Sequence, residues 1–424
     1  MTTPGEAFPA MSREAAPAVP REAAPAVPRE AAPAVPREVS PAVLREAELV
    51  HAVRGLRDEW AYWAELAGTE PMAKHTSQIE AITRLLGAGL DRADTFELVL
   101  DLFHVWDFFR AKLLLRRVGP LSRILAVADE LAWAVYRPSV LAAGVAAGRK
   151  EPPLVFLDRG AVPFAAARGA GYRDLLPRGV RTTAGLTAVR ELPVPVIGIP
   201  WYLTGHLPGV LLVAHEAGHH VEDDCGLTAD LPAALAGLDA GTAARWTPWL
   251  GEAFADVVAT VACGPAYPMI LAEALRDAGD GAGAESYPPP ADRLDLCRGA
   301  AGDDRTDSPA GSVGHRMATA RYAGLGDRSL RDVLTHPDVA RAEVGAAGLL
   351  RGLGSALTDV RAVLPAAALA FLADPPAYDT MRVDSRAVDE ILALRPRGPR
   401  AGNDPAAAEA RDLAAAQSLV KALS

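Results

Sequence analysis

The chain has few of the residues that mark secreted, membrane-spanning or nucleic-acid-binding proteins. Its 424 residues include three cysteines, without a Cys-X-X-Cys pair, so we expect a reducing cytoplasm rather than a disulfide framework. The first residues lack a basic start followed by an apolar core, and no apolar run is long enough to cross a bilayer. Acidic residues outnumber basic ones by 53 to 43, which disfavours nucleic acid as a partner. A cytoplasmic protein without a membrane partner is therefore expected.

Histidine is also scarce, with nine residues, yet two of them lie four apart in the pattern HEAGH at residues 215–219. On a helix, residues four apart lie on one face, so His215 and His219 can direct ring nitrogens at a single ion. Leu211 precedes them on the same stripe, and polar groups that continue an apolar face are costly unless they are paired. The spacing indicates a zinc (Zn²⁺) site in which Glu216 takes a proton from metal-bound water.

A zinc site of this kind needs a third protein ligand and an open position for water. The segment TPWLGEAFADVVATVA predicts a second helix, with Thr247 as its N-cap and Pro248 in its first turn. Glu252 and Asp256 lie four apart on one face of that helix. We favour Glu252 as the ligand because Asp256 comes with it and can orient a ligating histidine. The competing ligands lie close to the histidines in sequence: Glu222, Asp223, Asp224 and Cys225.

These residues resemble the gluzincin group of zinc metallopeptidases, in which HExxH is followed by ExxxD. The resemblance covers residues 194–256 and implies hydrolysis of peptide bonds by water activated on zinc. It implies one role for each motif residue: His215, His219 and Glu252 as metal ligands, Glu216 as the general base, and Asp256 as the carboxylate that orients a ligating histidine.

Enzymes of this group also use a tyrosine and a histidine from outside the metal helices to stabilise the oxyanion. Here Tyr287 stands before a proline run with Arg293 after it, while His315, Arg316 and Tyr322 follow further along. No spacing rule links these residues to the metal, so a structural role is the alternative for each. We take Tyr287 and His315 as the catalytic candidates.

The remaining segments predict an α+β, mostly helical fold. We expect a helical region over 45–150, a zincin-like catalytic domain with a small sheet and the HExxH helix over 151–400, and a tail over 401–424 that forms a terminal helix. Prolines surround the strand expected at 196–199, which predicts a sheet edge. That edge either receives the substrate backbone as an added strand or is simply protected by proline.

Residues 1–44 form a separate region built on an eight-residue repeat, REAAPAVP, which starts at Arg13, Arg21 and Arg29. Two prolines per repeat prevent a continuous helix and predict an extended chain of polyproline character. Its composition favours duplicated low-complexity sequence without a role. The alternative is a spacer or an arm that docks a protein partner, and the apolar helical region is the other candidate surface for such a partner.

Together these features predict a cytoplasmic zinc metallopeptidase that acts on peptides or proteins. One alternative is a non-peptidase zinc hydrolase that uses the same water on a different bond. Another is an inactive binding or regulatory protein in which the metal only holds the helices together. A structural zinc site closes its fourth position with protein, so a further ligand such as Cys225 would favour that last alternative.

Overall fold

A computed structural model describes residues 39–144, 150–169, 172, 175–176, 179–276, 287–302, 308–400 and 405–423. Its contacts divide the chain into two units, Met1–Arg45 and Glu46–Ser424. The first boundary lies one residue from the predicted end of the repeat region, and the repeats themselves lie outside the described residues. All structural statements below concern the second unit.

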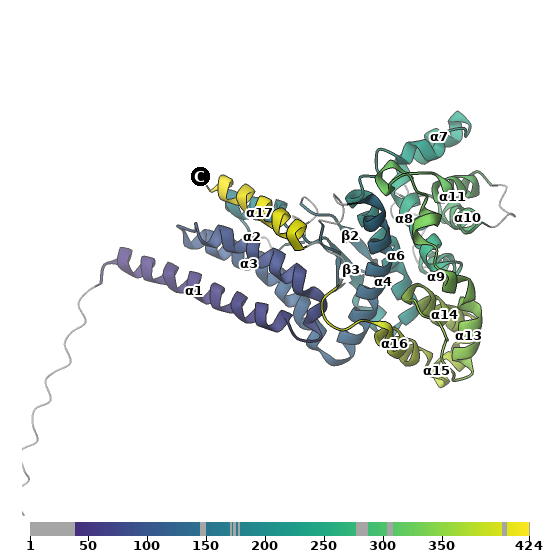
Figure 1. The fold of residues 1–424 in the computed structure, drawn as a ribbon, viewed down its shortest axis with the longest axis horizontal. Helices are drawn as coiled ribbons and strands as arrows, with labels where there is room; N and C mark the ends of the chain where they lie inside the picture. Colours follow the sequence, from purple (N-terminus) through teal and green to yellow (C-terminus); the bar gives the residue numbers. More distant parts are fainter. Residues whose placement is uncertain are drawn as a thin grey trace, which may run out of the picture. The chain divides into compact units, whose positions relative to one another are not determined.

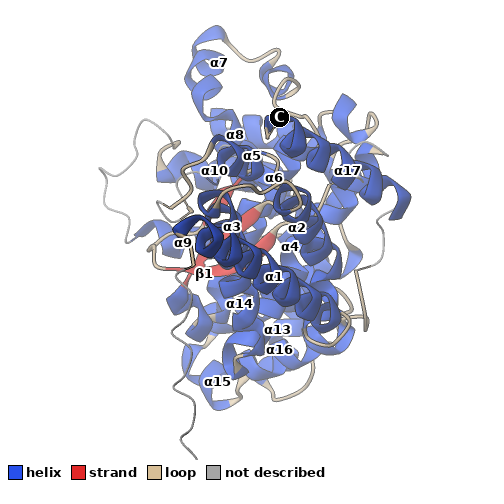
Figure 2. Cartoon of the chain, turned by 90° about the vertical axis from the view of Figure 1, so that its left-hand side faces the viewer, coloured by secondary structure: helices blue, strands red, loops and turns tan. Residues whose placement is uncertain are grey.

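The described chain is mostly helical with one small sheet, as the sequence predicts (Figure 2). The elements up to the sheet are α1 (Pro41–Ala67), α2 (Thr76–Leu90), α3 (Phe96–Leu114), α4 (Gly119–Ala143), β1 (Leu154–Asp158), β2 (Phe164–Ala166), α5 (Thr183–Arg190) and β3 (Val196–Pro200). The helices after the sheet are α6 (Val213–Asp224), α7 (Ala240–Trp246), α8 (Leu250–Cys263), α9 (Ala266–Arg276), α10 (Pro290–Ala301), α11 (Pro309–Thr319), α12 (Leu330–Leu334), α13 (Ala342–Leu350), α14 (Val360–Ala373), α15 (Pro375–Thr380), α16 (Val383–Leu394) and α17 (Pro405–Ala422). The last of these occupies the predicted terminal helix.

The strand that the sequence assigns to a sheet edge is instead the central one. The strand order is β1-β3-β2, with β3 parallel to β1 and antiparallel to β2. Proline is compatible with this position because Pro195 precedes the strand and Pro200 ends it, so neither removes an N–H from the middle of the ladder. The Pro195 carbonyl even accepts a hydrogen bond from the Leu154 N–H at 2.9 Å. The prediction of an edge strand at Val196–Ile199 is therefore wrong.

The sheet separates two hydrophobic cores, because successive side chains of a strand point to opposite faces. Val155, Ile197 and Ile199 pack with buried residues of α4, α6 and α8. Leu154 and Val196 pack on the other face with α2, α3 and α5. Figure 1 shows β2 and β3 between α2 and α3 on one side and α4 and α6 on the other. Helices from before and after residue 150 thus contribute to both cores.

Helices α10 and α11 approach each other backbone to backbone through glycine. A Cβ atom added at Gly314 would lie 1.9 Å from the Leu296 carbonyl oxygen, and one at Gly299 would lie 1.9 Å from the Gly311 oxygen. Only glycine allows this contact, since a carbonyl held in a helix has little freedom to move away. The contact fixes the position of α10, which carries Arg293.

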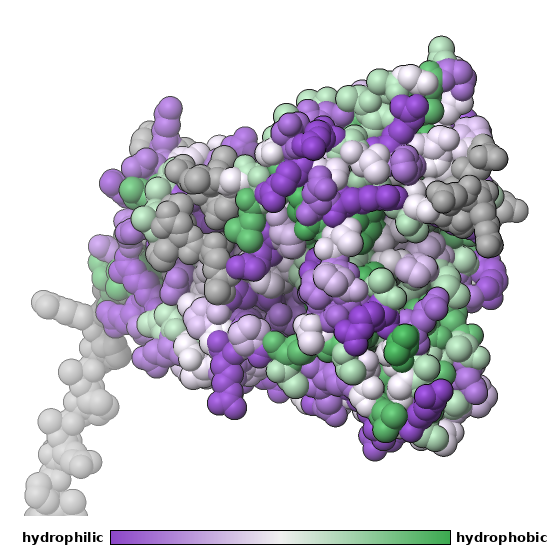
Figure 3. All heavy atoms as spheres, turned by 45° about the vertical axis from the view of Figure 1, so that its right-hand side comes forward, coloured by the Kyte–Doolittle hydropathy of each residue, from purple (hydrophilic) through white to green (hydrophobic). Residues whose placement is uncertain are grey.

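On the face of the molecule seen in Figure 3, hydrophilic and hydrophobic surface residues are interspersed. Among the described helices, none combines the length and the apolarity that crossing a lipid bilayer requires.

We predict that Gly314→Ala lowers the free energy of unfolding by about 1–3 kcal/mol, because the added methyl group would overlap the backbone of α10. Thermal unfolding followed by circular dichroism measures the change. Gly55→Ala is the matched control: this exposed glycine of α1 has open space around it, so alanine should raise stability by about 0.5–1 kcal/mol. An unchanged melting temperature in Gly314→Ala would contradict the close packing of the two helices.

Candidate metal centre

The candidate metal centre lies where α6 packs against α8. Small residues permit the close approach: a Cβ atom added at Gly218 would lie 2.8 Å from the Ala255 Cα atom. The segment η6, a 3₁₀ helix over Leu207–Leu212, leads directly into α6. Thr247 is not the N-cap of the second helix as predicted, because its hydroxyl donates to the Ala243 carbonyl at 2.8 Å and α8 begins at Leu250.

Three side chains from the two helices bring donor atoms together. His215 Nε2 lies 3.2 Å from His219 Nε2 and 3.2 Å from Glu252 Oε2, while His219 Nε2 lies 3.6 Å from Glu252 Oε1. Two zinc–ligand bonds of the usual length meeting at a tetrahedral angle place their donor atoms about 3.3–3.4 Å apart. The observed separations of 3.2–3.6 Å are close to these values, so the three groups could share one ion.

One carboxylate oxygen of this cluster lacks a hydrogen bond. Glu252 Oε2 is buried and makes no hydrogen bond to a described residue, although it lies 3.2 Å from His215 Nε2. A buried carboxylate oxygen without a hydrogen bond is costly. A cation between the three donor groups would satisfy it, so the donor set fits a metal ion.

Asp256 lies behind the cluster and orients His215. It is fully buried and accepts a hydrogen bond from His215 Nδ1 at 2.8 Å. In the neutral ring this contact places the proton on Nδ1 and leaves the Nε2 lone pair directed at the other donors. Tyr267 donates to Asp256 at 2.6 Å, and Arg293 donates to both carboxylate oxygens at 2.7 and 2.9 Å. Every oxygen of this buried carboxylate is thereby paired.

The charges of the cluster are tightly coupled. Burial by itself lowers the pKa of His215, but the carboxylates around it, Asp256 first, together raise that pKa to about 10. Burial raises the pKa of Glu252, yet the two histidines lower it more strongly, to about 2. Without metal the cluster thus holds a proton between a histidine and a carboxylate. Because ligands must lose such protons to bind a cation, metal binding here would release protons.

Glu216 stands next to the ligand pair without a fixed partner. Its side chain is 7% exposed, and no described residue forms a hydrogen bond or ion pair with it. Burial raises its pKa, and the nearby His215 and His219 offset only part of this rise. A carboxyl group whose pKa is raised toward neutral pH is suited to proton transfer near that pH.

Tyr287 lies beside the cluster, whereas His315 does not. Arg293 Cζ is 5.5 Å from the centre of the Tyr287 ring, and burial together with the Glu252 and Glu216 carboxylates raises the pKa of the Tyr287 hydroxyl. His315 is exposed on α11, and no interaction links its side chain to the cluster. The reason is that α11 turns its glycine face toward α10, which leaves His315 in solvent.

The competing ligands have other partners or positions. Glu222 accepts a hydrogen bond from Thr228 at 3.0 Å, and Asp223 is exposed. Asp224 is buried against Tyr136 and Arg168, and Cys225 has a buried free thiol. Within the described ranges, the donor group found around this point consists of three residues: His215, His219 and Glu252.

Two contacts that the sequence did not reveal hold α6 against its surroundings. His220 is buried and donates from Nε2 to the Val196 carbonyl of β3 at 3.1 Å. Burial lowers the pKa of His220 to about 4, so the ring is neutral at neutral pH. Tyr267 is the second unforeseen residue, and its only signal in the sequence is a polar aromatic within an apolar helix.

Comparison with family models, with curated proteins and with solved structures finds no match to this chain. The resemblance to gluzincins therefore rests on the motif residues alone.

We predict that Asp256→Asn lowers zinc affinity roughly 10–100-fold, because the amide no longer holds His215 in the required tautomer. The same change leaves Arg293 buried without a counter-charge, which should lower the free energy of unfolding by about 3–5 kcal/mol. Competition with a coloured chelator measures the affinity, and thermal unfolding measures the stability. Tyr267→Phe removes only one donor to the same carboxylate and should cost about 1 kcal/mol. Wild-type zinc affinity in folded Asp256→Asn would rule out the orienting role.

Proposed function

We propose that this chain is a zinc-dependent metallopeptidase of zincin-like architecture, with Glu216 as its general base. The observation that carries the proposal is the convergence of His215, His219 and Glu252 donor atoms at separations of 3.2–3.6 Å. The absence of a fourth protein donor among the described residues supports a catalytic rather than a structural site, because a catalytic zinc keeps one position open.

A bound zinc ion would acidify a water molecule and polarise the carbonyl of the scissile bond. Glu216 is adjacent to the ligand pair and has a raised pKa, so it is suited to accept the proton of that water and to pass it to the leaving amine. Asp256 keeps His215 in place throughout. The Tyr287 hydroxyl forms no hydrogen bond with a described residue and is the candidate donor to the oxyanion.

The sheet supports an extended peptide as the substrate. Because β3 is central, the edge strand that contacts α6 is β2, which is antiparallel to β3 and pairs with no second strand among the described residues. An edge strand can bind a peptide backbone by adding it as a further strand. The three buried free cysteines are in keeping with action in a reducing cytoplasm.

A non-peptidase hydrolase would use the same ligands and base, and only its substrate would differ. An inactive protein with a structural metal would bind zinc without turnover. Digestion of a mixed peptide library, read by mass spectrometry beside the metal content of the same sample, separates all three.

We predict that Glu216→Gln retains zinc but loses peptide hydrolysis by about 10²–10⁴-fold, because glutamine keeps the shape of the side chain and cannot accept the proton. Metal content is measured by elemental analysis and turnover with the best peptide from the library. Turnover at the wild-type rate would exclude Glu216 as the base.

We predict that His219→Ala and Glu252→Ala each lose stoichiometric zinc, because two remaining protein donors hold the ion too weakly. His51→Ala is the control, since His51 is an exposed histidine of α1. It should keep both zinc and activity. Full zinc occupancy in Glu252→Ala would remove the assignment of the third ligand.

A further inference from the structure

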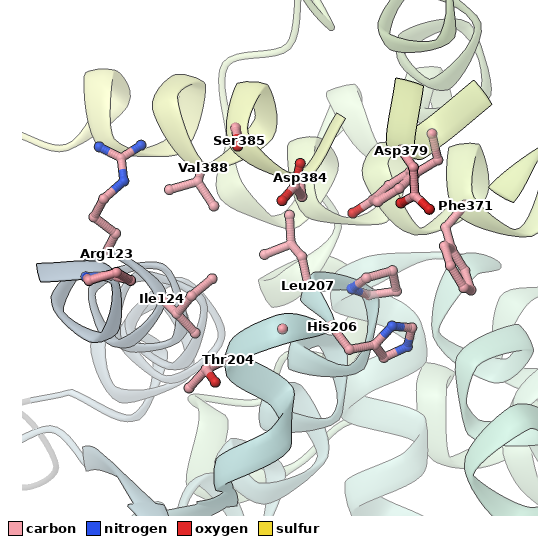
Figure 4. A pocket seen from close by; sticks show the side chains of 14 residues that line it. Arg123, Ile124, Thr204, His206, Leu207, Phe371, Asp379, Asp384, Ser385 and Val388 are labelled. Atoms are coloured by element: carbon pink, nitrogen blue, oxygen red, sulfur yellow. The ribbon is translucent and has the colours of Figure 1, made fainter. Parts of the chain in front are cut away.

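A cavity lies apart from the candidate metal centre, and its walls include none of His215, His219 and Glu252 (Figure 4). Its volume is about 250 Å³. Sites for drug-sized ligands occupy roughly 300–1,000 Å³, so the space suits a smaller molecule. Its walls come from the first turns of α4, from the end of η5 (Trp201–Gly205) and start of η6, and from α14, α15 and α16. His206, which precedes η6, also lines this cavity.

Aromatic rings form one wall of the cavity. His206 and Phe371 meet edge to face with their centroids 5.1 Å apart, and Phe371 meets Tyr378 in the same way at 5.4 Å. Tyr378 is 5% exposed, yet its buried hydroxyl forms no hydrogen bond with a described residue. A buried hydroxyl is normally paired, and this one has no partner among the described residues.

The charge of the cavity is negative. Asp379 and Asp384 both line it, and neither carboxylate pairs with a described residue. Arg123 lies at the opposite end from Asp379 in Figure 4, and its guanidinium forms an ion pair with Asp389. Burial lowers the pKa of His206, which keeps that ring neutral at neutral pH. Two uncompensated negative charges therefore face the space.

The first turn of α16 also borders the cavity, and a helix N-terminus by itself attracts anions. Here Asp384 occupies that turn and already supplies the negative charge. Both carboxylates would repel an anionic ligand, so the charge distribution favours a cation.

We propose that this cavity binds a small aliphatic amine as a cation, with ammonium groups held by Asp379 and Asp384. An ammonium group donates up to three hydrogen bonds and can therefore pair with the Tyr378 hydroxyl as well as a carboxylate. Its carbon chain lies against the aromatic wall, whose ring faces attract a cation. The two carboxylates suit an amine with two charges.

The test uses the full-length protein and three probes of matched length in isothermal titration calorimetry. We expect 1,4-diaminobutane to bind with one site per chain and more weakly at high salt. The neutral 1,4-butanediol should bind at least tenfold more weakly, since it lacks the charge that the carboxylates recognise. The dianion succinate should not bind. Binding of succinate, equal binding of diol and diamine, or no binding of the diamine would each overturn the proposal.

Four variants locate the site. Asp379→Asn and Asp384→Asn should each lower the affinity for 1,4-diaminobutane about tenfold or more. Tyr378→Phe should weaken binding without lowering the melting temperature, because the hydroxyl it removes has no described partner. Glu343→Gln, an exposed acid of α13 outside the cavity, removes the same charge and should bind as the wild type does. Wild-type affinity in both folded aspartate variants would place the amine elsewhere and refute the proposal.

Discussion

One buried carboxylate, that of Asp256, joins the four helices around the candidate metal centre. It lies on α8, binds His215 of α6, accepts from Tyr267 of α9 and forms a two-point ion pair with Arg293 of α10. Burial raises the pKa of Asp256, but Arg293 and His215 lower it more strongly, so the group is charged in the folded protein. A buried charge is tolerated only when it is paired in this way. The geometry of the histidine ligands therefore depends on helices that contribute no ligand.

Helix α6, which carries the two histidines, is held at three points along its length. His215 is fixed by Asp256, His220 by the Val196 carbonyl of the central strand, and Asp224 by Tyr136 and Arg168. The central strand is itself fixed, because hydrophobic cores pack on both of its faces. Ligands that must meet a metal within a few tenths of an ångström need such rigid support.

The two candidate sites differ in how their negative charge is compensated. At the metal centre, carboxylates and histidines converge, and a divalent cation would complete the set. In the second cavity, Asp379 and Asp384 form no ion pair with a described residue, and Arg123 at the opposite end is paired with Asp389, which suits an organic cation. A short segment connects the sites: His206 lines the cavity, η6 follows, and α6 begins at Val213.

The sequence by itself determined what depends on local spacing. The separation of four residues places His215 with His219, and Glu252 with Asp256, on single helix faces wherever those helices lie. Composition and periodicity likewise predicted a mostly helical chain with a small sheet. Only the tertiary structure decided that these two faces meet, that Arg293 and Tyr267 complete the ion pair, that β3 is central and that His315 points away. The physical reason is that helical periodicity fixes which residues share a face, whereas the partner of that face is chosen by packing between segments distant in the chain.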